Sequence, residues 1–187
     1  MSLIVYQGIN FGDVGLGREA PASSGLIFAA QRGDSAAFQE LVYDYEPLVL
    51  RVALYVTGSQ EAAQQIYCWV FKDAFVSVNR LNPGSSVFIW LYRILVRRCL
   101  EHCRRHPYVI ASDCSDKDFE SRLRMAVSSL APNERVIFQL KQYQRLKIRT
   151  LAEIFNVTPE SVIKSLQNAH AHLQRQSTVD VRGPLST

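Results

Sequence analysis

Residues 150–173 read TLAEIFNVTPESVIKSLQNAHAHL, and their pattern indicates two helices joined by a short turn. Thr158 followed by Pro159 is typical of a helix start, because the hydroxyl caps the first turn and proline loses nothing where no N–H is needed. The apolar spacing predicts a short helix before this point and a long one after it, with Leu151 and Val162 in a shared core. This arrangement is typical of a helix-turn-helix, whose second helix enters the major groove of DNA.

The helix-turn-helix prediction assigns roles to the residues around it. Val157 is expected to fill the turn, and Leu166 to seat the longer helix on the core. The outward positions of that helix are candidate base-reading residues: Glu160, Ser161, Lys164, Ser165 and Asn168. The basic residues ahead of the motif are candidate phosphate contacts: Lys141, Arg145, Lys147 and Arg149. Phosphate contacts orient a protein on DNA but do not select a sequence. A helical hairpin that only packs remains the alternative.

Charge is unevenly distributed along the chain. Residues 121–187 carry ten Lys/Arg and four Asp/Glu, a net charge of +6. Residues 108–120 carry one Lys and four acids, a net charge of −3. A basic C-terminal part behind an acidic linker favours a polyanionic partner, although such an excess can also be an ordinary solvated surface.

The remaining periodicity is helical, and no alternation of polarity indicates a sheet. Asp34 is expected to cap a helix that Pro47 bends and Gly58 ends, and Ser59 to open the next. The sequence therefore predicts an all-α protein of two small helical domains joined by a linker, the C-terminal one a helix-turn-helix. The expected boundaries are a flexible segment at 1–25, a first domain at 26–107, an acidic linker at 108–120, a second domain at 121–176, which opens with a helix near 120–129, and a flexible tail at 177–187.

Several classes of function find no support in the sequence. No apolar run approaches the ~20 residues that cross a bilayer, and no secretory signal is visible, so we expect a cytoplasmic protein without membrane insertion. The sequence lacks a glycine-rich phosphate loop, a nucleophile elbow and an HExxH pair, so we expect neither an enzyme nor a small-molecule substrate or cofactor.

Cysteine and histidine are the residues to weigh for metal binding. The four cysteines have irregular spacings and are expected to be free thiols: Cys68, Cys99, Cys103 and Cys114. Cys99, His102, Cys103 and His106 share one helical face, but the outer two lie roughly 10 Å apart along the axis. One zinc ion cannot bind all four from a straight helix, so we expect no metal.

From about residue 33 to 175 the chain resembles the extracytoplasmic-function (ECF) sigma factors of bacterial RNA polymerase, in the sigma-70 superfamily. The matching segments occur in the family's order: GDSAAFQELVYDYEPLVLRVALYVTGS (33–59), EAAQQIYCWVFKDAF (61–75), NPGSSVFIWLYRILVRRCLEHCRRH (82–106), LAPNERVIFQL (130–140) and 151–173. The resemblance implies that the first domain binds core polymerase and the promoter −10 element, and that the second binds the −35 element. It also leaves room for an anti-sigma factor as a partner.

The resemblance also implies site residues in the first domain. The positions expected to dock on the polymerase are Glu61, Gln64, Gln65, Cys68, Trp69 and Asp73. The family has acids at more of these positions than this chain has. The positions expected to contact the melted −10 strand are Phe88 and Tyr92 by base stacking, and Arg97 and Arg98 at phosphates.

This chain departs from the family at three surfaces. Docking acids are fewer, the family's Phe-Arg-x-Trp run reads Val87-Phe88-Ile89-Trp90, and the recognition helix lacks most of its arginines. Two alternatives therefore stay open beside a sigma factor that directs transcription initiation. One is a sigma-like protein-interaction module that binds a partner or polymerase without opening a promoter, and the other is a stand-alone helix-turn-helix regulator.

Overall fold

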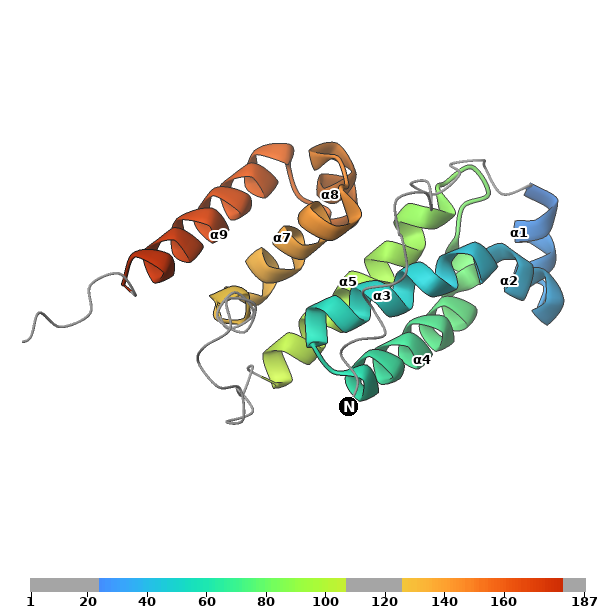
Figure 1. Cartoon of the computed structure of the whole chain (residues 1–187). Coiled ribbons are helices and arrows are strands. Elements are labelled where there is room, and N and C mark those ends of the chain that lie inside the picture. The colour runs from blue at the N-terminus through green and yellow to red at the C-terminus, as the bar shows by residue number, and fades with distance from the viewer. Residues whose placement is uncertain (1–23, 107–125, 180–187) are drawn as a thin grey trace, which may run out of the picture.

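The structure is a computed structural model that describes residues 24–106 and 126–179. All regular elements in these two ranges are helical, which confirms the predicted fold class. The first module, residues 24–106, contains α1 (Ser24–Gln31), α2 (Ser35–Val42), η3 (Tyr43–Tyr45), α3 (Glu46–Thr57), α4 (Gln60–Ser77), η4 (Val78–Arg80) and α5 (Val87–Arg105). The second module, residues 126–179, contains α7 (Pro132–Gln144), α8 (Ile148–Phe155) and α9 (Pro159–Val179). Figure 1 shows the two modules side by side.

The described ranges test only part of the expected domain boundaries. α1 begins before the expected boundary at 26, and α9 continues into the expected tail at 177–187. Of the helix expected near 120–129, only a helical turn at 126–128 is described. Residues 1–23, the linker at 108–120 and residues 180–187 lie outside the described residues.

Local sequence signals set the helix ends of the first module. The Asp34 carboxylate accepts hydrogen bonds from the backbone N–H groups of Ala36 and Ala37, so it caps α2 as predicted. Ser59 caps α4 in the same way. Gly58 ends α3 with φ 67°, a left-handed conformation that glycine adopts without strain.

The expected bend at Pro47 is replaced by a helix start. The 3₁₀ turn η3 interrupts the run after α2, and Pro47 then lies in the first turn of α3. Proline fits this position because the first backbone N–H groups of a helix have no intrahelical acceptor. The chain thus forms two helices where the sequence predicted one bent helix.

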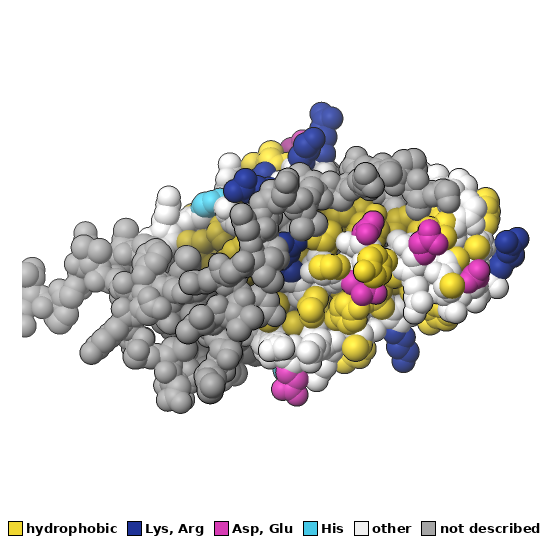
Figure 2. Space-filling view, turned by 45° about the vertical axis from the view of Figure 1, so that its right-hand side comes forward, with side chains coloured by type: hydrophobic (Ala, Val, Ile, Leu, Met, Phe, Trp, Pro, Cys, Tyr) yellow, Lys and Arg dark blue, Asp and Glu magenta, His cyan; other side chains and the backbone are white. Residues whose placement is uncertain are grey.

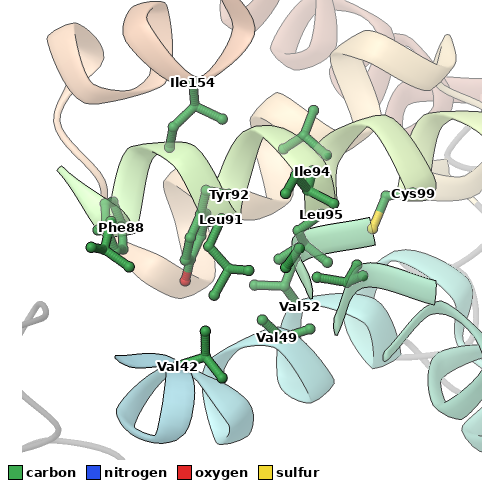
Figure 3. Packing of buried hydrophobic residues seen from close by; sticks show 14 of the residues in the cluster. Val42, Val49, Val52, Phe88, Leu91, Tyr92, Ile94, Leu95, Cys99 and Ile154 are labelled. Carbon is green, nitrogen blue, oxygen red and sulfur yellow. The ribbon is translucent and has the colours of Figure 1, made fainter. Parts of the chain in front are cut away.

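The core of the first module lies between α3, α4 and α5. Val49, Leu91 and Leu95 are fully buried there, and Cys99 continues the same face of α5. Figure 3 shows Leu91 and Leu95 pointing from α5 toward Val49 of α3. α5 is therefore fixed along its length by one continuous apolar face, which determines which of its side chains can reach solvent.

The second module has the predicted helix-turn-helix. α8 ends at Asn156, which has φ 53°, and Ser161 N–H donates to the Thr158 hydroxyl at the start of α9. Val162 is fully buried, as expected. Val157 is 44% exposed, so the prediction that it fills the turn is wrong. The left-handed Asn156 already closes the turn by returning its own N–H, and that of Val157, to α8.

The two modules pack against each other. The Gln139 side chain of α7 donates to the carbonyl oxygen of Tyr55 at 2.6 Å, and the rings of Tyr55 and Tyr143 stack with centroids 4.1 Å apart. The Arg93 guanidinium donates twice to the carbonyl oxygen of Glu153, at 3.0 and 3.1 Å. We call these contacts the seam. Through it, buried residues of both modules form one continuous apolar cluster.

Ile154 of α8 is the apolar part of the seam nearest the start of α5. It is buried and lies over α5 in Figure 3. In the described residues, no helix is long and apolar enough for a bilayer crossing.

Candidate polymerase and nucleic-acid interfaces

The aromatic residues near the start of α5 belong to the core. Phe88 is 8% exposed and Tyr92 is 1% exposed, and their ring centroids lie 4.2 Å apart. Tyr45 packs on Phe88 from the other side. Burial raises the pKa of the Tyr92 hydroxyl above its ordinary value. The expectation that Phe88 and Tyr92 stack on DNA bases is therefore wrong, because both rings are buried against η3 and α3.

The two arginines expected at phosphates bind the same carboxylate. Arg98 donates to both oxygens of Asp73 at 2.7 Å, and Arg97 donates to Oδ2 at 3.0 Å. Arg98 also pairs with Glu101 at 2.9 Å. The hydrogen bonds from Arg98 are the main cause that holds the pKa of Asp73 below its ordinary value. Asp73 therefore has a structural partner in α5, which the expected docking role did not include.

Exposure separates Arg97 from Arg98. The Arg97 side chain is 59% exposed, whereas that of Arg98 is 27% exposed. The Arg98 guanidinium carbon also lies 5.9 Å from the centroid of the Trp69 ring, within cation–π range. Arg97 thus keeps room for a phosphate, while Arg98 joins α4 to α5.

α4 presents the remaining expected docking residues on its outer side. Glu61, Gln64, Gln65, Cys68 and Trp69 are all exposed. Figure 2 shows hydrophobic side chains over much of the visible surface of the first module, with acidic side chains scattered among them. Of the five exposed residues of α4 named above, Glu61 alone is acidic. An interface on this helix would therefore depend more on apolar area than on charge.

Two further exposed residues of α4 were missed from the sequence. Phe75 is 46% exposed and Val76 is 71% exposed. Val76 follows Trp69 by two helical turns, so its spacing from Trp69 was the signal that could have placed it on the same side.

The expected base-reading residues of α9 are mostly held by other groups of the chain. Ser165 donates to the carbonyl oxygen of Ser161, and the Ser161 hydroxyl lies 3.2 Å from that of Thr158. Asn168 donates to the Glu134 carboxylate at 3.0 Å. These bonds reduce what the side chains can offer to base edges.

Charge at the start of α9 divides between Glu160 and Lys164. Hydrogen bonds from the Glu160 backbone N–H and from the Thr158 hydroxyl lower the pKa of Glu160. Its carboxylate thus serves the helix N-terminus, where negative charge is favourable. Lys164 is exposed, and its ammonium has no hydrogen bond or ion pair with any described residue.

The expected phosphate contacts also divide into two groups. The half-buried Lys141 donates to the carbonyl oxygen of Leu146 at 3.2 Å, so its ammonium stabilises the turn after α7. Arg145, Lys147 and Arg149 are exposed around the start of α8. These three remain suited to a phosphate backbone.

The cysteine–histidine face of α5 is split between core and surface. Cys99 is fully buried and Cys103 is 4% exposed, and burial raises the pKa of both thiols. The rings of His102 and His106 lie against each other, with centroids 4.7 Å apart. Among the described residues, no three His, Cys, Asp or Glu side chains are placed to hold a metal ion. Cys68, Cys99 and Cys103 are free thiols, and Cys114 lies outside the described residues.

Comparison with known proteins adds an independent line of evidence. Residues 41–107, which include α3, α4 and α5, match the family model of sigma-70 region 2. The chain is 25% identical over 173 residues to the ECF RNA polymerase sigma factor SigM of Mycobacterium tuberculosis, covering 85% of this chain and 86% of SigM. It is 24% identical over 147 residues to the RNA polymerase sigma factor SigV of Bacillus subtilis, covering 73% of this chain and 89% of SigV.

Solved structures share the fold. CnrH in complex with the cytosolic domain of CnrY matches with a TM-score of 0.64 at 17% identity, covering 86% of this chain and 99% of CnrH. The sigma factor RpoE of Bartonella quintana, in complex with the anti-sigma factor NepR, matches with a TM-score of 0.58 at 15% identity, covering 76% of this chain and 98% of RpoE. Residues 41–107 match sigma-70 region 2 and most of the chain is similar to ECF-type sigma factors, which agrees with the region 2 helices and the helix-turn-helix described above.

Proposed function

We propose that this chain binds core RNA polymerase through the first module and promoter DNA through both modules, and so directs transcription initiation. The observation that carries the proposal is the sigma-70 region 2 match at residues 41–107, which includes α4 and α5, the helices with the candidate polymerase and −10 surfaces. The role consists of binding, with no catalytic step or cofactor of the chain's own. It places the protein in the bacterial cytoplasm, beside the polymerase.

The outer side of α4 is the proposed polymerase-docking surface. Glu61, Gln64, Gln65 and Cys68 supply polar contacts there, and Trp69 supplies the largest apolar area. Partly exposed tryptophans often dominate interface energies, because they exclude water over a large area. Because Glu61 is the one acid among these residues, this surface should bind with weak salt dependence.

The exposed edge of α5 is the proposed contact for the −10 strand. Arg97 is the proposed phosphate contact. Asp73 is reassigned here from docking to positioning, because it holds Arg97 and Arg98 at the junction of α4 and α5.

The second module is the proposed −35 reader. Arg145, Lys147 and Arg149 would hold the phosphate backbone, and α9 would enter the major groove with Lys164 exposed. Because these cations are few, the second module should bind isolated duplex DNA with low affinity. Binding to polymerase is then needed to raise the effective concentration of this module at the promoter.

An anti-sigma factor is a further proposed partner. The RpoE structure contains a sigma factor with a bound anti-sigma factor, the CnrH structure contains the cytosolic domain of CnrY, and both share the fold of this chain. The proposal for this chain rests on that shared fold.

Co-purification of the full-length chain with purified bacterial core polymerase at low salt, followed by run-off transcription, tests the proposal. Trp69→Ala should weaken polymerase binding about tenfold, as expected for an interface anchor. Phe28→Ala is the matched control, since Phe28 is 51% exposed on α1, outside α4, and its loss should change binding less than about twofold. No binding of the native chain to core polymerase would refute the proposal.

The second candidate function is a sigma-like module that occupies polymerase without opening a promoter. The observation that favours it is the closure of Arg97 and Arg98 onto Asp73. It predicts polymerase binding without a transcript, and no gain when Gln64 and Gln65 are replaced by glutamate. A stand-alone regulator predicts instead that the chain binds duplex DNA without polymerase.

A further inference from the structure

Three exposed side chains on the outer side of α9, Ile163, Lys164 and Gln167, are available to contact a partner. Ile163 and Gln167 were not among the expected base-reading residues, and Lys164 was. Among the described residues, neither the Gln167 carboxamide nor the Lys164 ammonium forms a hydrogen bond or an ion pair. This contrasts with Ser161, Ser165 and Asn168, which are hydrogen-bonded within the protein.

Ile163 is placed by its fully buried neighbour. Val162 points into the module core, and the next side chain is rotated by about 100° around the helix axis. Ile163 is 40% exposed as a result. Gln167 follows one turn later on the same side of α9, so the two side chains are neighbours.

The position of α9 leaves this side accessible. α7 and α8 pack on α5, whereas α9 lies on the side of the second module away from the first (Figure 1). A branched alkyl group beside a free carboxamide and an ammonium can therefore meet a partner without competing with the seam.

We propose that Ile163 and Gln167 select two A·T base pairs of the −35 duplex, Ile163 by contact with a thymine methyl group and Gln167 by hydrogen bonds to adenine. The inference rests on the proposed function. In the major groove only thymine presents a methyl group, and a carboxamide pairs with N6 and N7 of adenine. The two side chains lie about 6 Å apart along the helix axis, which restricts them to base pairs within about two steps of each other.

Lys164 supplies a different kind of contact. Its ammonium is a point charge that binds phosphate or guanine without the paired geometry of a carboxamide. The choice of A·T pairs therefore belongs to Ile163 and Gln167, and general affinity to Lys164.

The first step of the test finds the preferred duplex. Full-length chain and core polymerase together are used to retain duplexes from a pool that is randomised in the −35 region. The inference predicts enriched sequences with at least one thymine and one adenine at fixed positions, within about two base pairs of each other.

The second step removes single groups from that duplex. Each thymine is replaced in turn by deoxyuridine, which lacks only the methyl group. At one position the change should weaken binding of the native chain by roughly threefold to tenfold, and binding of Ile163→Ala by less than about twofold. Replacement of one adenine by 7-deazaadenine should in the same way affect the native chain and not Gln167→Ala.

Val157→Ala is the matched control. Val157 is a similarly exposed apolar side chain, 44% exposed, but it lies in the turn before α9. This variant should keep the full discrimination between thymine and deoxyuridine. The circular dichroism spectrum of each variant should match that of the native chain, because neither Ile163 nor Gln167 is buried.

Two failures can be told apart. If the selected duplex binds equally well with thymine and deoxyuridine at every position, or if Ile163→Ala keeps the difference, the inference is overturned and the proposed function stands. If the chain with polymerase retains no duplex beyond polymerase alone, the proposed function fails and the inference fails with it.

Discussion

α5 and α9 are both long helices with one buried face and one face proposed for DNA, but they treat their polar groups differently. On α5, Arg93 bonds to a carbonyl of α8, and Arg97 and Arg98 bond to Asp73 of α4. On α9, Ile163, Lys164 and Gln167 extend into solvent. The arginines of α5 thus stabilise the protein, whereas the first turns of α9 leave exposed side chains that can contact a ligand.

Basic composition alone therefore does not locate a DNA surface. α5 carries more Lys/Arg than α9, yet more of its cations have partners in the protein.

The buried faces of the two helices should differ in how much they stabilise the protein. Leu95→Ala in α5 should lower the free energy of unfolding by roughly 3–4 kcal/mol, because it opens a cavity in the larger core. Val162→Ala in α9 removes fewer atoms from a smaller core and should cost roughly 2 kcal/mol. Urea unfolding of the full-length chain measures both values.

Leu50→Ala is the control for this pair. Leu50 is 36% exposed on α3, so its loss should cost less than about 1 kcal/mol. If Val162→Ala were as costly as Leu95→Ala, the two cores would be energetically equivalent, and the comparison would lose its structural basis.

The ion pairs of α5 should contribute stability that α9 lacks. Asp73→Asn should lower the free energy of unfolding by roughly 1–2 kcal/mol at neutral pH, since Arg98 loses a two-point acceptor. The folded state lowers the pKa of Asp73, so its contribution is present above the unfolded pKa of about 4 and is lost as pH falls below it. Unfolding curves at several pH values should therefore converge for the native chain and the variant in acid.

Glu40→Gln provides the matched comparison. Glu40 is an exposed acid of α2, and its replacement should change stability by less than about 0.5 kcal/mol at any of these pH values. A pH-independent difference between Asp73→Asn and the native chain would mean that the ionised carboxylate is not what stabilises the junction.

Lys164 of α9 should contribute to the salt dependence of DNA binding. Lys164→Ala should weaken binding of the chain–polymerase complex to promoter DNA at all sequences, and lower the slope of log affinity against log salt by about one unit. Asn168→Ala should leave this slope unchanged, because its amide is neutral and bonds to Glu134. An unchanged slope for Lys164→Ala would place its ammonium away from the phosphates.

What the sequence could predict was local. The caps at Asp34 and Ser59, the glycine at Gly58 and the buried Val162 follow from neighbouring residues and helical period, and the structure confirms each. The all-helical class and the helix-turn-helix follow from the same signals.

What the sequence could not predict depends on distant partners. Phe88 and Tyr92 are buried because η3 and α3 cover that side of α5, and periodicity does not say which helix covers which side. Asp73 meets Arg97 and Arg98 more than twenty residues later, and Asn168 meets Glu134 more than thirty residues earlier. Helix-wheel positions predicted exposure on α9 but not which exposed groups the fold would already use.

The stacked rings of Tyr55 and Tyr143 have a consequence beyond the packing they provide. A ligand that enters between α5 and α8 must first break the hydrogen bonds from Arg93 to Glu153. Its apparent dissociation constant therefore equals the intrinsic dissociation constant divided by the fraction of molecules in which these two helices are already separated. The more the stacking of Tyr55 on Tyr143 stabilises the packed modules, the smaller that fraction becomes. Tyr55 and Tyr143, which are remote from any base, can thus set the apparent affinity for that ligand.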